Sequence, residues 1–124
     1  MKKIISSSFA PAAVGPYSQA VLSGDTLYVS GQLPIDPSTG KMAVGIQAQT
    51  KQSLANTDAI LREAGFSRGD VVKSTVLLDN LDDFAAMNAV YGEFYSEPYP
   101  ARVAYEVVRL PLGAMVEIET IAVR

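Results

Sequence analysis

The alternation of strand-like and helical segments constrains the fold of this 124-residue chain more than any other feature of its sequence. Residues 46–64 are predicted to form a helix, because Ile46, Leu54 and Leu61 recur on one face of a helical repeat. Residues 82–95 are predicted to form a second helix, whose acidic first turn suits the N-terminal helix dipole. Each helix lies between strand-like runs, so the chain is neither all-helical nor all-strand.

The strand-like segments are short and rich in residues that favour strands. Two of them flank Ser23-Gly24-Asp25, whose turn-forming residues predict a hairpin. The predicted strands cover residues 17–22, 26–33, 70–79, 102–109 and 115–123, with a further short strand at 3–5. The order is therefore β-β-α-β-α-β-β, and the natural packing for that order is a mixed sheet with both helices on one face.

The size and apolar content of the chain predict one domain that associates with further copies of itself. A length of 124 residues fits a single domain. Hydrophobic residues make up 48% of the chain, which is a high content for so small a domain to bury. Because large exposed apolar patches mark contacts between subunits, we expect a homo-oligomer.

Charge and missing residue types exclude several classes of function. The formal charge of -3 and the lack of any basic run longer than Lys2-Lys3 argue against nucleic acid as a partner. The chain has no cysteine and no histidine, which excludes thiolate nucleophiles, disulfides and serine–histidine hydrolysis and removes the commonest metal ligand. Carboxylates, tyrosines, lysines, arginines, hydroxyls and backbone groups are left to carry any catalysis.

The apolar runs of the chain bear on its location. The isoleucine pair that follows Lys2-Lys3 is too short for the apolar region of a signal peptide. No run approaches the roughly 20 apolar residues of a transmembrane helix. We therefore expect a soluble, cytoplasmic protein without membrane contacts.

Arg102 is the first residue of a predicted apolar strand, in the sequence PARVAYEV. Arginine is rarely buried without a partner, so its guanidinium points to solvent, pairs with a carboxylate or binds an anionic ligand. The alternation of a strand places Ala104 and Glu106 on the same face as Arg102.

Two glutamates, Glu117 and Glu119, share one face of the otherwise apolar strand MVEIETIAV. At least one of them should have a partner if the sheet is covered at this point. The alternative is a solvated sheet face on which ion pairs contribute little.

Four further positions fit a pocket, although each also has a structural interpretation. Gly31, next to Ser30 in a strand-like run, marks either a bulge or the close approach of a ligand to the backbone. Asn88 lies one turn after Phe84 on the apolar stripe of its helix, where it forms a structural cross-link or part of a polar pocket. Tyr17, at a predicted strand start, is either ordinary core or a pocket wall.

Several stretches of the chain together resemble the RidA (YjgF) family of enamine/imine deaminases. They are APAAVGPYSQAV, YVSGQLPIDPSTG, QTKQSLANTDAILREAG, DVVKSTVLL, NAVYGEFY, PAR and RLPLGAMVEIETIAV, which span nearly the whole chain. The resemblance implies that residues 1–124 form a single RidA-like domain with an α+β, chorismate-mutase-like fold. It also implies a homotrimer whose sheets form a central barrel, with active sites in the clefts between subunits.

The resemblance also implies an activity. Family members with the arginine hydrolyse 2-aminoacrylate, 2-iminobutyrate and similar 2-imino acids to 2-keto acids and ammonia, without a cofactor. By this resemblance Arg102 binds the substrate carboxylate, a task that suits a planar, permanently charged fork. Glu117 positions the attacking water and accepts its proton. The positions implied for the rest of the pocket are Tyr17, Ser30, Gly31, Asn88 and Ala104.

One departure from the family pattern bears on the substrate range. Many family members read PARSCVEV, whereas this chain reads PARVAYEV, so Ala104 stands where they have a pocket cysteine. Val103 and Tyr105 differ as well. We expect the smaller, more apolar Ala104 to admit bulkier imino-acid side chains.

Two other functions use the same residues differently. The main alternative is a non-enzymatic trimer that binds small carboxylates and acts as a regulator or chaperone-like protein. A ribonuclease activity, attributed to some relatives, fits poorly with an acidic chain that has no histidine.

Overall fold

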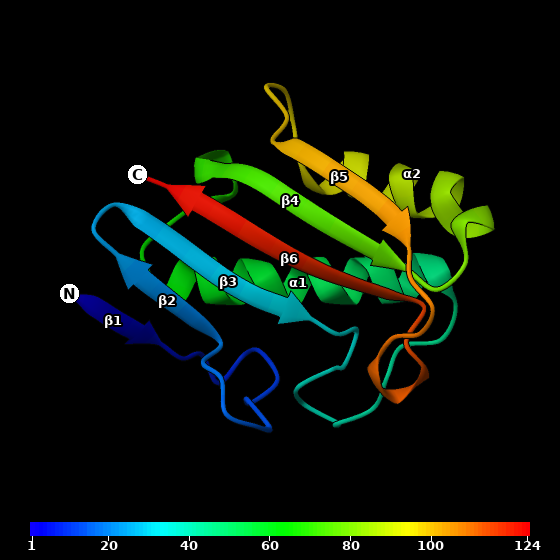
Figure 1. The fold of residues 1–124 in the computed structure, drawn as a ribbon, viewed down its shortest axis with the longest axis horizontal. Coiled ribbons are helices and arrows are strands. Elements are labelled where there is room, and N and C mark those ends of the chain that lie inside the picture. The colour runs from blue at the N-terminus through cyan, green and yellow to red at the C-terminus, as the bar shows by residue number, and fades with distance from the viewer.

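The computed structural model describes all of residues 1–124, which form a six-stranded sheet with both long helices on one face (Figure 1). The sheet order is β1-β2-β3-β6-β4-β5, and every neighbouring pair is antiparallel except β4 and β5, which are parallel. The elements are β1 (Lys2–Ile5), β2 (Ala20–Ser23), β3 (Thr26–Gln32), α1 (Ile46–Glu63), β4 (Val71–Leu78), α2 (Phe84–Phe94), β5 (Ala101–Glu106) and β6 (Val116–Val123). The predicted mixed sheet with two helices on one face is confirmed, as is the short first strand.

The hairpin between β2 and β3 forms where its turn residues predict it. Ser23 pairs with Thr26 across the turn. Gly24 has a φ of 60°, in the left-handed region that glycine adopts at little cost.

The strands end close to where they are predicted, except that β2 begins three residues later and β5 ends three residues earlier, where their partners end. β1 ends at Ile5, which pairs with Ala20, so β2 begins at Ala20 and Tyr17 lies in the preceding loop. β4 ends at Leu78, which pairs with Glu106, so β5 ends there rather than at residue 109. The placement of Tyr17 at a strand start is therefore wrong.

The core lies between the helices and one face of the sheet, and the other face is open. The fully buried side chains on the helix side include Leu27, Leu54, Ile60, Leu61, Val76, Leu78, Met87 and Ile118. On the open face, Tyr28, Val103 and Tyr105 remain 50%, 43% and 47% exposed. Apolar side chains of this size on an uncovered sheet face are typical of a surface that contacts another subunit.

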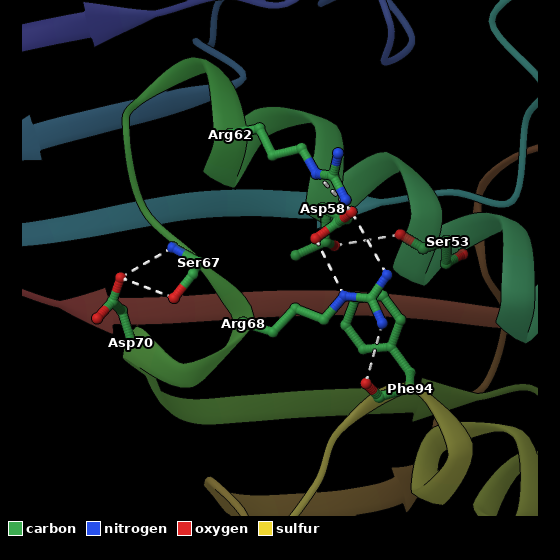
Figure 2. Close-up of polar contacts among 8 residues, drawn as sticks. Ser53, Asp58, Arg62, Ser67, Arg68, Asp70 and Phe94 are labelled. Atoms are coloured by element: carbon green, nitrogen blue, oxygen red, sulfur yellow. Dashed lines mark hydrogen bonds and ion pairs between the residues drawn. The ribbon is translucent and has the colours of Figure 1, made fainter.

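A cluster of polar contacts fixes the C-terminal end of α2 to α1 (Figure 2). Asp58 on α1 accepts from Arg62 Nε at 3.0 Å and from Arg68 Nε at 3.1 Å. Arg68 also donates to the carbonyl oxygen of Phe94 at 3.1 Å and lies 3.9 Å from the centre of its ring. The end of α2 is thereby held, which fixes the helix that covers β5.

Candidate active site

Arg102 lies on β5 with its guanidinium against α2 and without a carboxylate partner. One of its nitrogens donates to Asn88 Oδ1 at 2.7 Å. The guanidinium carbon is 4.8 Å from the centre of the Tyr91 ring and 5.5 Å from that of Phe84. Glu106, on the same strand face, accepts instead from the backbone N–H of Leu81. No carboxylate of the chain therefore balances the charge of Arg102, and several of its donors are unused.

A small hollow opens beside this guanidinium. It has a volume of about 440 Å³ and is lined by Asn88, Tyr91, Gly92, Tyr99, Pro100 and Arg102. Asn88 lies on the helix face of Phe84, as predicted, but it is exposed at the rim of the hollow rather than buried. Met87 and Tyr91 fill the buried side of α2, and Asn88 instead faces the edge strand β5, where it meets Arg102.

A second, larger groove lies around Glu117. Its volume is about 860 Å³. Its lining includes Tyr17, Ser30, Gly31 and Glu117 together with Val14, Gln19, Leu33, Ile35, Leu112 and Glu119. Four of the residues predicted to belong to a pocket are thus brought together here, and Tyr17, 50% exposed, is a groove wall rather than core.

Gly31 allows the side chain of Glu117 to lie against the backbone of β3. A Cβ atom at this position would lie 2.7 Å from Glu117 Oε2 and 2.9 Å from its Cδ. The pairing of β3 with β6 also shifts register between Val29 and Gln32, so the bulge interpretation and the close-approach interpretation of Gly31 both hold. Ser30 donates its hydroxyl to the Ser18 carbonyl at 2.6 Å, which leaves its oxygen as an acceptor at the groove.

The fold raises the proton affinity of the Glu117 carboxylate. Burial raises its pKa above the ordinary value, and the negative charge of Glu119 on the same strand face raises it further. A carboxyl group with a raised pKa in a groove suits proton transfer near neutral pH.

The raised pKa predicts how Glu117→Gln changes stability. Because the native state binds this proton more tightly than the unfolded state, stability falls as pH rises from the ordinary glutamate pKa through the raised one. At about pH 7 we therefore expect the free energy of unfolding of the variant to be slightly higher than that of the wild type. The difference should be less than about 1 kcal/mol, because solvent screens the site. Near pH 4 the difference should vanish, since both proteins are then neutral at position 117.

Denaturant unfolding at fixed protein concentration measures this difference at the two pH values. Glu93→Gln makes the same chemical change at an exposed position on α2, outside the groove, and is the matched control. A destabilised Glu117→Gln variant at neutral pH would contradict the prediction.

The hollow and the groove lie on opposite faces of the sheet. Ser74 of β4 pairs with Arg102 on one side and Thr120 on the other, and it is buried toward the helices. Leu77 of β4 pairs with Glu117. Leu77 is three positions after Ser74, and an odd offset reverses the face of a strand, so Arg102 lies on the helix side and Glu117 on the open side. One chain does not bring these two residues together.

Ala104 and Leu112 are the remaining positions of interest. Ala104 lies on the face of Arg102, as predicted, but it packs against the core and lines neither the hollow nor the groove. Leu112, which the sequence reading missed, lines the Glu117 groove with a φ of 58°. Non-glycine residues with a positive φ concentrate at functional sites. The sequence Pro111-Leu112-Gly113 predicts a turn, but it does not indicate that Leu112 adopts this conformation beside a groove.

Two classes of site are not found in this chain. No three acidic side chains come together in a way that could hold a metal ion. Neither helix is long and apolar enough to cross a membrane.

The chain matches known proteins over nearly all of its length. Residues 7–124 match the family model described as Endoribonuclease L-PSP. The 2-iminobutanoate/2-iminopropanoate deaminase of Salmonella typhimurium is 49% identical over 127 aligned positions, which cover 100% of this chain and 99% of that protein. Among solved structures, RidA from the Antarctic bacterium Psychrobacter has a TM-score of 0.96 at 50% identity, with 98% of this chain and 99% of that one covered. TdcF of Escherichia coli with bound serine has a TM-score of 0.95 at 46% identity, with 98% of each chain covered.

The α+β fold, with an unpaired arginine beside a hollow and a glutamate in a groove, is thus shared with these proteins along almost the whole chain. The chain belongs to the Endoribonuclease L-PSP family, which is the RidA (YjgF) family that its motifs resemble.

Proposed function

We propose that this protein hydrolyses 2-imino acids such as 2-aminoacrylate, in its imine form, and 2-iminobutyrate. Water adds to the imine carbon, the C–N bond breaks, and a 2-keto acid and ammonia leave. The observation that carries the proposal is Arg102, a guanidinium beside a hollow with no carboxylate of the chain to neutralise it. Two relatives named 2-iminobutanoate/2-iminopropanoate deaminase, 50% and 49% identical over 91% and 99% of their lengths, support the same chemistry.

Arg102 is proposed to bind the substrate carboxylate. Only one hydrogen bond within the chain uses its guanidinium, so an edge of the planar fork is free for a bidentate contact. Such a contact fixes the imine carbon at a defined distance from the fork. Holding an already electrophilic carbon beside an ordered water supplies much of the rate, and no cofactor is required.

Glu117 is proposed to position the attacking water. Its carboxylate accepts a proton from the water as oxygen bonds to the imine carbon. The protonated carboxyl then gives this proton to the imine nitrogen, which completes a carbinolamine. The hydroxyl proton of the carbinolamine passes through the same carboxylate to the nitrogen, so the C–N bond breaks, ammonia leaves and the carbonyl forms. The raised pKa of Glu117 supports both steps, because a group that takes and gives a proton works best when its pKa is near the working pH.

The complete site is proposed to form between subunits of a homotrimer with a chorismate-mutase-like arrangement. Arg102 and Glu117 lie on opposite faces of the sheet, so the hollow of one subunit and the groove of its neighbour together supply both groups. The open sheet face, with Tyr28, Val103 and Tyr105, supports a central barrel that would cover it. Each chain is then a single domain that carries two half-sites.

The other pocket positions have roles that follow from their contacts. Tyr17 and Ser30 form the wall of the groove, and Gly31 leaves room for the Glu117 side chain. Asn88 acts through its hydrogen bond to Arg102. Ala104 packs against the buried core, and its effect on substrate size stays a prediction. Comparison of rates on 2-iminopropanoate and longer imines tests that effect, and a strict preference for the shortest would contradict it.

A coupled assay tests the proposed activity. A pyridoxal-phosphate dehydratase generates 2-aminoacrylate from serine or 2-iminobutyrate from threonine, and semicarbazide traps the imine in competition with hydrolysis. We expect the protein to accelerate release of the 2-keto acid and to reduce the trapped fraction. A correctly folded trimer that does neither would support the non-enzymatic carboxylate-binding function instead.

Gly31→Ala should impair turnover more than folding. The new Cβ would lie 2.7 Å from the flexible end of Glu117, which can move away at little energetic cost. The displaced carboxylate no longer holds the water correctly, so we expect kcat to fall by roughly 100-fold while KM, set by Arg102, changes little. Steady-state kinetics and a melting curve measure the two effects. Gly69→Ala, where a Cβ would make only an ordinary 3.7 Å contact, is the matched control.

The family name, Endoribonuclease L-PSP, suggests a ribonuclease activity, which needs a test of its own. The formal charge of -3 provides no extended positive surface for a phosphate backbone. We expect no RNA cleavage. Cleavage that depends on Arg102 would overturn this expectation.

A further inference from the structure

A stripe of side chains on α2 surrounds the Arg102 guanidinium. Phe84, Asn88 and Tyr91 are spaced i, i+4 and i+7, so they share one face of the helix. That face meets β5, because all three residues contact Arg102 of that strand. The two rings lie 5.5 Å and 4.8 Å from the guanidinium carbon, and Asn88 accepts its hydrogen bond at 2.7 Å. We call these three residues the α2 cradle.

The α2 cradle holds the guanidinium with neutral groups only. Arg62 and Arg68 differ from Arg102 in this respect, because both form ion pairs with the carboxylate of Asp58 (Figure 2). Aromatic rings attract a cation through their quadrupole, and an amide oxygen accepts one hydrogen bond, but neither cancels the charge. Arg102 is thus fixed in place and still able to bind an anion.

Tyr91 is the rigid part of the α2 cradle. It is only 4% exposed, and its ring centre lies 4.9 Å from that of Tyr95, which in turn packs edge-on against Phe94 at 4.7 Å. Burial raises the pKa of Tyr91, and the nearby Ser74 hydroxyl and the charge of Arg102 offset only part of that effect. The ring therefore faces the guanidinium as a neutral phenol with a fixed orientation.

We propose that Asn88 and Tyr91 are positioning residues that present Arg102 to the substrate carboxylate without neutralising it. This inference rests on the proposed function, because it assigns these residues to the carboxylate-binding step. According to this proposal, the side chain at position 88 must be uncharged. An aspartate there would have the same shape but would pair with Arg102 and compete with the substrate.

Asn88→Asp is the decisive variant because it changes charge and little else. The probe is 2-oxobutanoate, the stable 2-keto acid product, whose affinity is measured by NMR titration or calorimetry. We expect its Kd and the KM for 2-iminobutyrate to rise by about tenfold or more, with kcat within about threefold of wild type and no loss of thermal stability. Ala89→Asp, an exposed neighbour on α2, adds the same charge away from Arg102 and should bind as wild type.

Two substitutions at Tyr91 separate the ring from its hydroxyl. Tyr91→Phe keeps the ring, so Kd and KM should stay within about twofold of wild type. Tyr91→Leu removes the ring, so both should rise by about tenfold if the variant folds. Because loss of a buried ring can also unfold the protein, the Asn88→Asp result stands as the independent test.

The binding measurement distinguishes failure of this inference from failure of the proposed function. A wild-type protein that binds 2-oxobutanoate but hydrolyses no imine would overturn the deaminase, while the variants would still report on the α2 cradle. Asn88→Asp that binds 2-oxobutanoate as tightly as wild type would overturn the α2 cradle, whatever the activity of the protein.

Discussion

Replacing Arg102 with alanine is expected to remove nearly all imine hydrolysis while leaving the fold intact. A bidentate contact between a guanidinium and a carboxylate contributes two charge-assisted hydrogen bonds, so kcat/KM should fall by roughly 10²- to 10⁴-fold. Within the chain, Arg102 makes only one hydrogen bond, to the exposed Asn88, so the free energy of unfolding should change by about 1 kcal/mol or less.

The dehydratase-coupled assay and a denaturation curve measure both effects on the same protein. Arg102→Lys keeps the charge but not the planar fork, and its kcat/KM should be intermediate. Arg109→Ala, an exposed arginine in the following loop, is the matched control and should be as active as wild type. Wild-type kcat/KM in Arg102→Ala would remove the basis of the proposed function.

Two inactive variants are expected to restore activity when their subunits mix. Arg102→Ala retains an intact Glu117 groove, and Glu117→Gln retains an intact Arg102 hollow. If each site forms between neighbouring subunits, random association makes about one quarter of the sites complete, with each intact half supplied by a different chain. Each variant alone should have almost no activity.

Unfolding an equal mixture and refolding it together gives the mixed oligomers, and native mass spectrometry counts them. The same proteins refolded separately and then combined are the control, and they should stay inactive until subunits exchange. Mixed oligomers without activity would mean that both groups of a site come from one chain. That result would contradict the composite site.

Local patterns predicted the elements of the fold well. The alternation in β6 is visible in the sequence: Val116, Ile118 and Thr120 share one face and Glu117 and Glu119 the other, as predicted, and the first face is the buried one. The β2–β3 turn and both helices also carry strong local signals. These features depend on residues close together in the chain, and a single sequence contains that information.

The relation between the half-sites could not be predicted in the same way. Alternation shows which residues share a face within one strand, but it does not show how the faces of different strands align. That alignment depends on pairing, and here the parallel register of β5 with β4 sets Arg102 opposite the buried Ser74. The exposed position of Asn88 likewise depends on which part of α2 overhangs the sheet edge.

The placement of Arg102 and Glu117 on opposite faces has a consequence for how such a protein would behave at low abundance. On the proposed composite site, a free subunit is inactive, and turnover per chain depends on the fraction of chains that are assembled. Around the concentration at which subunits dissociate, the total rate of imine hydrolysis would rise more steeply than the amount of protein expressed. Dilution, rather than an inhibitor, would then be the simplest means of switching the activity off.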